Sequence, residues 1–505
     1  MTIAMIANMT VAASRASGHE GLLRQDLAVH NGILYCMRAD ATGGHAALEE
    51  SERRYMSEPA REVVDLSRLL DEGPWSALQK RVLALAALAF AVDGIANQAL
   101  GLALPSLIRD WAVPREAFAP VAALGLIGVA LGSAIGGLLG DRTGRRAGLI
   151  GSVVLFGAMT AAMAAVHGFP ALLALRFLAG LGIGGAIPNG AALLSEFTPF
   201  RHRNIAIAVG MLLIPVGGVI AGTIGALVLA SWGWRGVFAI CGLLPLLVGL
   251  AFVFALPESP RFLARLPHRH VDLRALLARC GLVVTAGSLL HEEPATHRAP
   301  WHALLERGRR LDSIALWFGF FFCLLASYTM FSWVPTMLMG QGFGLAMTSV
   351  GLTSFNIGGM LGGVACGWLI GLLGSRTAGV GLALGATAGA LVLGVLPFDP
   401  QSAVRVCAAL LAEGMFIGGL HNALYTVAAF IYPPAVRATG VGAAAGLGRI
   451  GAVVSSYTGV LTLKLAGPSG YFIVIAVALA LAGLGTAGIR RGVPPRTQPG
   501  LAVHT

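Results

Sequence analysis

Several ionisable residues lie within or beside long apolar runs of the sequence, among them Asp93, Arg176, Glu196 and Arg449. At the centre of a bilayer an ionised side chain costs about 2.5–3.5 kcal/mol on insertion scales, so such residues are functional candidates by default. Burial penalises the charged form of a carboxylate, which suits a group that takes up and releases a proton. An arginine stays charged and binds carboxylates through two parallel hydrogen bonds. These residue types therefore indicate proton and anion handling.

Asp93 and Arg449 are the two residues deepest in their runs. Asp93 lies about 12 residues, or about 18 Å of helix, into the first run, and we expect it to handle a proton or a substrate. A structural ion pair, or a water-exposed kink beside Gly94, is the alternative. Arg449 lies within the sequence GRIG. Acidic residues are almost absent from the apolar runs of the second half, which favours an anionic ligand for Arg449 over a structural pair with Asp93 or another carboxylate.

Arg176 and Glu196 lie at the two ends of one run, RFLAGLGIGGAIPNGAALLSE. For Arg176 we weigh a role in proton coupling against a buried structural pair. Glu196 is expected to pair with the arginines of a short charged loop, GGLLGDRTGRR (136–146), and thereby to act as a gate. The alternative is that this loop only marks topology. The gating candidates are Asp141, Arg142, Arg145, Arg146 and Arg437.

Further polar and aromatic side chains within the runs are candidates for ligand contact. His421 and Asn422 fall in mid-run, although an intramembrane histidine as often makes a bond between helices. One run is crowded with six aromatic residues, Phe318, Phe321, Phe322, Tyr328, Phe331 and Trp333. Such rings can line a pocket for a flat substrate, but most of them are expected to face lipid or neighbouring helices. The substrate-binding candidates are Arg449, Asn97, Gln98, Asn189, His421, Asn422 and Trp333.

The composition is typical of a membrane protein. Hydrophobic residues make up 56% of the chain and charged residues 12%, whereas soluble domains carry about 25% charged residues. The net charge of +11 comes mostly from arginines between apolar runs, so it indicates topology rather than a nucleic-acid partner. The six cysteines form no CxxC pair, and no catalytic or metal-ligand constellation is visible, so we expect no metal, no cofactor and no enzyme. A GxGxxG match at 180–185 lies inside an apolar run and indicates helix packing.

The apolar runs predict twelve transmembrane helices, since about 20 residues cross the hydrocarbon core. The expected spans are 82–108, 118–140, 147–166, 170–195, 203–231, 234–256, 313–339, 346–371, 376–397, 402–431, 438–465 and 469–489. The fold class is therefore an all-α membrane protein with two six-helix bundles, 82–256 and 313–489. A cytoplasmic linker (257–312) joins the bundles, and a cytoplasmic extension (1–81) and tail (490–505) flank them. Residues 63–81 are expected to form a short amphipathic segment.

Charge and internal repetition support this arrangement. With both termini cytoplasmic, nine arginines lie inside against five basic residues outside, and the linker adds nine arginines inside. The halves also repeat weakly. At an offset of 230, the residues Gly137, Asp141, Gly144 and Arg146 fall on Gly367, Gly371, Gly374 and Arg376. At offsets of 233–234, Asn189 and Arg203 fall on Asn422 and Arg437. Duplicated halves of six helices are a transporter pattern, with a substrate site expected near the midplane.

The loop GGLLGDRTGRR resembles the signature between the second and third helices of the major facilitator superfamily. More narrowly, several stretches resemble the aromatic acid:proton symporter family. They include DGIANQALGLALP (93–105), RFLAGLGIGGAIPNGAALLSEFTP (176–199), LPESPRFL (256–263) and YPPAVRATGVGAAAGLGRIG (432–451). The resemblance covers about 63 to 490. It implies twelve helices in two bundles and import of a small aromatic carboxylate, such as benzoate or a hydroxybenzoate, together with a proton.

The resemblance also implies residue roles. It matches Asp93 to the family's first-helix aspartate, Asp141 to the loop aspartate, Arg176 and Glu196 to the fourth-helix pair, and Arg437 and Arg449 to the arginines of the eleventh helix. Two departures change the expected proton stoichiometry and cargo. The family's DGxD pattern has Ala96 at its second acid, followed by Asn97 and Gln98, which can supply hydrogen bonds instead of charge. Gly371 stands where the second charged loop would have an acid.

We therefore expect a secondary transporter of the bacterial inner membrane that takes up a small aromatic acid with a proton by alternating access. We expect it to be a monomer with both termini in the cytoplasm. The alternatives are an exporter, a transporter of another organic anion, and a transport-inactive sensor that signals through the linker. Met56 is an alternative to Met1 as the start of the chain.

Overall fold

The computed structural model describes residues 63–73, 75–282, 289–291, 304–306 and 308–495. The predictions for residues 1–62, including Met56 as the start, lie outside the described residues. Two three-residue strands, β1 (Val63–Asp65) and β2 (Leu289–His291), accompany a structure that is otherwise helical. The compact unit that begins at Val63 contains the helices described below.

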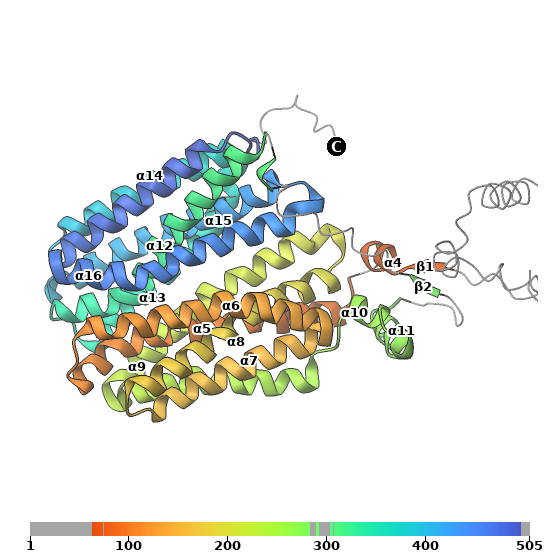
Figure 1. Ribbon diagram of the computed structural model, residues 1–505, viewed down its shortest axis with the longest axis horizontal. Coiled ribbons are helices and arrows are strands. Elements are labelled where there is room, and N and C mark those ends of the chain that lie inside the picture. Colours follow the sequence, from red (N-terminus) through yellow and green to blue (C-terminus); the bar gives the residue numbers. More distant parts are fainter. Residues whose placement is uncertain (1–62, 74, 283–288, 292–303, 307, 496–505) are drawn as a thin grey trace, which may run out of the picture. The chain divides into compact units, whose positions relative to one another are not determined.

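The first group of long helices forms from the apolar runs of the first half (Figure 1). It comprises α5 (Ala77–Trp111), α6 (Ala119–Thr143), α7 (Arg145–Ala162), α8 (Phe169–Phe197) and α9 (Phe200–Ala255), with the short turns η2 (Arg115–Phe118) and η3 (Met163–Ala165). The prediction of one amphipathic segment over 63–81 was wrong. Helix α4 (Leu66–Glu72) ends first, and α5 begins at Ala77 because Ser76 and Gln79 form a reciprocal capping box.

The second group forms in the same way from the second half (Figure 1). It comprises α12 (Arg310–Gly340), α13 (Leu345–Leu373), α14 (Ser375–Val395), α15 (Ala403–Ile431) and α16 (Pro434–Gly488), with the turn η6 (Pro400–Ser402) before α15. Within each group the helices pack on one another, and we call the two groups the first bundle and the second bundle.

Two of the long helices each contain two membrane spans. Ten helices in the described part of the chain are long and apolar enough to cross a membrane. Of these, α9 is interrupted at Gly233 (φ 60°, ψ −158°) and α16 at Gly467 (φ 63°, ψ −160°). These torsions lie in a region that is essentially confined to glycine, so each residue marks the kink where two helices meet. The twelve predicted spans are therefore confirmed.

The linker helices lie at one end of the bundles (Figure 1). They are α10 (Pro260–Ala264), the turn η4 (Pro267–Arg269) and α11 (His270–Arg279). We call this end the linker end and the opposite end, where Gly233 and Gly467 lie, the far end. Large apolar side chains remain exposed along the spans, for example Leu227, Phe254 and Val395 at 74%, 83% and 84%. Such exposure is expected where a helix faces lipid, since the bilayer interior is itself apolar.

Candidate functional site

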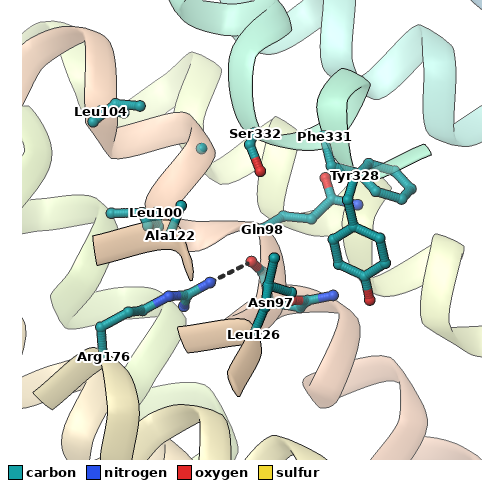
Figure 2. A pocket seen from close by; sticks show the side chains of 11 residues that line it. Asn97, Gln98, Leu100, Leu104, Ala122, Leu126, Arg176, Tyr328, Phe331 and Ser332 are labelled. Carbon is teal, nitrogen blue, oxygen red and sulfur yellow. Dashed lines mark hydrogen bonds between the residues drawn. The ribbon is translucent and has the colours of Figure 1, made fainter. Parts of the chain in front are cut away.

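A cavity lies between the two bundles, with walls from α5, α6 and α8 on one side and α12 on the other (Figure 2). The polar and aromatic residues of its lining are Asn97, Gln98, Arg176, Tyr328, Phe331 and Ser332. The rest of the lining is apolar, and a mostly apolar wall with a few polar groups is typical of a small-molecule site.

Arg176 carries the cation of this cavity and is only 6% exposed. Its Nη2 donates to the carbonyl oxygen of Asn97 (3.2 Å) and its Nη1 to that of Ala96 (3.5 Å), so α5 holds the guanidinium in place. Its buried Nε has no hydrogen-bond partner among the described residues. Gly125 on α6 leaves the space, because a Cβ atom there would lie 2.7 Å from that Nε. No described carboxylate lies within ion-pair distance, so the charge is available to an anion.

Gln98, another residue of the cavity lining that the sequence analysis selected, is hydrogen-bonded to the second bundle. Its Nε2 donates to Oδ1 of Asn356 on α13 (2.7 Å), and Nδ2 of Asn356 donates back to Oε1 of Gln98 (2.9 Å). Both side chains are buried, at 7% and 2% exposure. Asn356 was missed by the sequence analysis, although a polar amide in mid-span gave the same kind of signal as Asn422.

Asp93 and Arg449 are brought within electrostatic range of each other across the bundle interface. Asp93 is 2% exposed, and its Oδ1 has no hydrogen-bond partner among the described residues. Arg449 also acts electrostatically on His421 and Tyr425 of α15. The rings of His421 and Tyr425 lie 5.1 Å apart, and the buried Nε2 of His421 lacks a described partner. The lining of the cavity includes none of Asp93, Arg449, His421 and Tyr425.

A network of charges connects the first bundle at the linker end. Arg145 forms an ion pair with Asp141 and a second one, at 3.5 Å, with Glu196, as expected from the sequence. Glu196 in turn accepts a hydrogen bond from the hydroxyl of Ser259, just before α10. Arg145 and Glu196 are 14% and 12% exposed, so their pair is partly shielded from water. The network joins α6, α7 and α8 to the linker.

Two further gating candidates of the first bundle behave differently. The backbone N–H of Arg146 donates to Oε1 of Glu258 (3.0 Å), and its side chain donates to the carbonyl oxygen of Val253. Arg142 is exposed. In the second bundle, Nε of Arg437 donates to the carbonyl oxygen of Tyr432 (3.3 Å), which ends α15.

The remaining predicted contact residues lie outside the cavity lining. Asn189 is 1% exposed and its Nδ2 donates to the carbonyl oxygens of Gly136 (2.9 Å) and Gly185 (2.8 Å), which joins α8 to α6. Trp333 is fully buried against Gly459 of α16. Asn422 is partly buried and lies beside α13. For these residues a contact with substrate stays a prediction.

One intramembrane acid escaped the sequence analysis. Glu413 on α15 is completely buried, and neither of its carboxyl oxygens has a hydrogen-bond partner among the described residues. It lies against Gly389 of α14, where a Cβ atom would be 2.3 Å from its Oε2. The signal was the one used for Asp93, an acid inside an apolar run. It was overlooked because acids are scarce in the apolar runs of the second half of the chain.

Known proteins resemble the chain in sequence and in fold. The gallate transporter of Pseudomonas putida is 33% identical over 452 residues, which cover 87% of this chain and 99% of that protein. The 4-hydroxybenzoate transporter of Pseudomonas aeruginosa is 31% identical, with coverage of 81% and 91%. The benzoate transport protein of Acinetobacter baylyi is 26% identical, with coverage of 77% and 85%. These relatives are transporters, which confirms the prediction of a transporter rather than an enzyme.

Solved structures support the fold independently. The crystal structure of a D-xylose–proton symporter superposes with a TM-score of 0.63 at 17% identity and covers 83% of this chain and 98% of that chain. A partially occluded inward-open structure of the xylose transporter from E. coli gives a TM-score of 0.64 at 17% identity, with coverage of 83% and 99%. The family model described as Major Facilitator Superfamily matches residues 86–456. The chain therefore belongs to the major facilitator superfamily.

Proposed function

We propose that this transporter takes up a small aromatic carboxylate together with a proton. The names of the relatives support an aromatic acid, since they transport gallate, 4-hydroxybenzoate and benzoate. The cavity between the bundles carries the proposal, because it combines the guanidinium of Arg176, whose Nε has no hydrogen-bond partner among the described residues, with the rings of Tyr328 and Phe331. A carboxylate would bind the cation while its ring lies against the aromatic and apolar wall.

The proposed cycle uses groups from both bundles. Asp93 exchanges the coupled proton, and Arg176 and Glu196 assist the coupling, as the sequence predicts. The position of Arg176 in the cavity wall also supports a direct contact with the carboxylate of the cargo. Arg449, from the second bundle, draws the anion toward Asp93, so that binding an acid and neutralising Asp93 favour each other. The ion pairs around Arg145 then form and break as the linker end closes and opens.

The proposed setting is the bacterial inner membrane, with the linker end and both termini in the cytoplasm. The excess of arginines at that end supports this orientation. We place the bundles at 82–256 and 313–489, joined by the linker 257–312, and propose that one chain forms the complete transport unit. No bound cofactor enters the cycle, because the proton itself is the coupling ion.

Uptake by purified protein in proteoliposomes tests the proposal. Labelled benzoate, 4-hydroxybenzoate, gallate and a non-aromatic carboxylate would be offered with and without an imposed pH step, acidic outside. We expect accumulation of an aromatic acid that needs the pH step and disappears when a protonophore is added. Accumulation of the non-aromatic acid alone would show that the cargo is not an aromatic acid. Transport only in the outward direction would identify an exporter. Tight binding without any flux would identify a sensor.

A further inference from the structure

The two bundles are joined in the middle and toward the far end. Within the described residues, the hydrogen bonds and ion pairs between bundles are few. The side chain of Arg115 donates to the carbonyl oxygen of Leu463 (3.1 Å), and Lys464 pairs with Glu116 (3.6 Å) at the far end. The remaining two bonds form the buried Gln98–Asn356 pair. By contrast, the ion pairs of the linker end among the described residues join helices of one bundle or involve the segments outside the bundles, and none of them joins the two bundles. We therefore call the far half the closed half.

The Gln98–Asn356 pair is the buried member of this set. Each amide donates one hydrogen bond to the other and accepts one, and Nδ2 of Asn356 also donates to the carbonyl oxygen of Leu352 (2.9 Å). Gly218 on α9 makes room for both side chains, because a Cβ atom there would lie 2.4 Å from Nε2 of Gln98 and 2.6 Å from Oδ1 of Asn356. Helices α5 and α9 of the first bundle and α13 of the second bundle therefore all contact this pair of amides.

The pair also borders the cavity, because Gln98 is part of its lining (Figure 2). If α5 and α13 separate at this level when the far half opens, both hydrogen bonds of the pair break. Water can then satisfy the amides, whereas in the closed half the two amides bond to each other, and that of Asn356 also to Leu352. A buried amide that has lost its partner is penalised, while replacement of both partners by apolar groups of similar shape can be nearly neutral.

We propose that Gln98 and Asn356 form a releasable clasp that stabilises the state with a closed far half. Asn356 acts as a positioning residue: it fixes the amide of Gln98 at the cavity wall and ties it to the second bundle. Rupture of the clasp accompanies each opening toward the far side. The clasp goes beyond the proposed function, since it concerns the equilibrium between two states and holds for any cargo.

Distances between spin labels at the far end test the clasp. Labels on Arg109→Cys of α5 and Ala346→Cys of α13, both exposed positions, report the separation of the bundles. The background is the full chain with its six native cysteines replaced by serine, checked for folding and ligand-free monodispersity. In Asn356→Leu, the stranded amide of Gln98 should raise the ratio of open to closed distances about tenfold. The Gln98→Met/Asn356→Leu double variant should shift it much less than the single one.

A matched control lies one turn away on the same helix. The hydroxyl of Thr353 donates to the carbonyl oxygen of Ser349 in its own helix and faces Gly222 of α9. Thr353→Val should leave the distance distribution unchanged, because it removes no bond between bundles. Equal distributions for the parent and Asn356→Leu would overturn the clasp, and so would single-variant shifts that simply add in the double variant. The measurement needs neither cargo nor gradient, so a failed uptake experiment would not affect its outcome.

Discussion

The two bundles share the geometry of their turns but hold different charges. Gly144, between α6 and α7, has φ 105° and ψ 149°, and Gly374, between α13 and α14, has φ 79° and ψ 159°. Gly233 and Gly467 match each other more closely, at φ 60° and 63°. The separations of these pairs, 230 and 234 residues, agree with the offsets of the weak sequence repeat. All four conformations are essentially confined to glycine.

The turns at Gly144 and Gly374 are held in place by different partners. In the first bundle a side chain does so, because Glu258 accepts a hydrogen bond from the backbone of Arg146, next to the acid–arginine network. In the second bundle the partner is Val493, in the segment that follows α16. The N–H of Ser375 donates to the carbonyl oxygen of Val493 (2.9 Å), and the N–H of Val493 donates to the hydroxyl of Ser375 (2.8 Å).

The comparison separates what the fold needs from what function can use. The same turn is held once by a carboxylate and once by the hydroxyl and backbone groups of Ser375 and Val493, so carboxylates are not required to form it. The additional charges of the first bundle are therefore available for gating and proton exchange. In the second bundle, Gly371 stands at the position that corresponds to Asp141 of the first bundle. The charged residue of the second bundle that the proposed function uses is Arg449.

The largest effect is expected at the acid of the first bundle. Asp93→Asn should abolish accumulation driven by a proton gradient, because an amide cannot release a proton. Uptake into proteoliposomes with an imposed pH step measures it. Asp110→Asn is the control on the same helix, since Asp110 accepts a hydrogen bond from Trp234 at the far end (2.9 Å) and an amide oxygen can still do so. Normal accumulation by Asp93→Asn would remove the residue from the coupling step.

The cation of the second bundle should give the next largest effect. Arg449→Ala should raise the half-saturation concentration for a carboxylate about 10- to 100-fold, since a hydrogen bond to a charged group contributes about 1.5–3 kcal/mol. Concentration-dependent uptake measures this value. Arg405→Ala, which removes an exposed arginine of α15, should leave it unchanged. An unaltered half-saturation concentration in Arg449→Ala would exclude a contact with the anion.

The network of the first bundle should respond more moderately. Glu196→Gln keeps a partner for Ser259 but removes the charge facing Arg145, and we expect the uptake rate to fall about tenfold. Glu306→Gln is the matched control, because Glu306 is 53% exposed in its pair with Arg309. Exposed pairs contribute little, so that variant should transport normally. Equal rates for both variants would mean that the network only marks topology.

The turns at Gly144 and Gly374 should both be destabilised when the glycine is replaced by alanine. Gly144→Ala and Gly374→Ala should each destabilise the protein by about 1–3 kcal/mol, because an alanine is strained in this conformation. The loss should be greater at Gly144, where a Cβ atom would lie 2.3 Å from Oε2 of Glu258, than at Gly374, where it would lie 3.1 Å from the oxygen of Val493. Thermal unfolding in detergent compares the two. A greater loss at Gly374 would contradict the comparison.

The smallest effect is expected when the missing acid is restored. Gly371→Asp would copy Asp141 into the second bundle, but the nearby Arg376 is exposed. Stability should therefore change by no more than about 0.5 kcal/mol, and uptake should stay near the parent rate. Thermal unfolding and uptake rates of the same preparation check both points. A large gain in either would show that the second loop lacks only its acid to form a comparable network.

The membrane spans could be predicted because each depends on local properties of the chain. Apolar length specifies a span, arginine-rich loops specify the turns, and the repeat offsets located Gly144 and Gly374 correctly. The pair of Glu196 with Arg145 was also accessible, because both lie at the same end of adjacent helices. The capping box at Ser76 was a local signal too, and its neglect led to the wrong boundary at 63–81.

The contacts between bundles could not be predicted in this way. Gln98 and Asn356 are 258 residues apart, and their pairing depends on how two helices are rotated about their axes and how closely the bundles approach at Gly218. Arg176 illustrates the same limit, since its partners are carbonyl oxygens of α5 rather than an acid. The sequence by itself determined the helices, their order and the charges they carry. Only the tertiary structure decided which of those charges and amides meet, because that depends on packing between distant helices rather than on any local pattern.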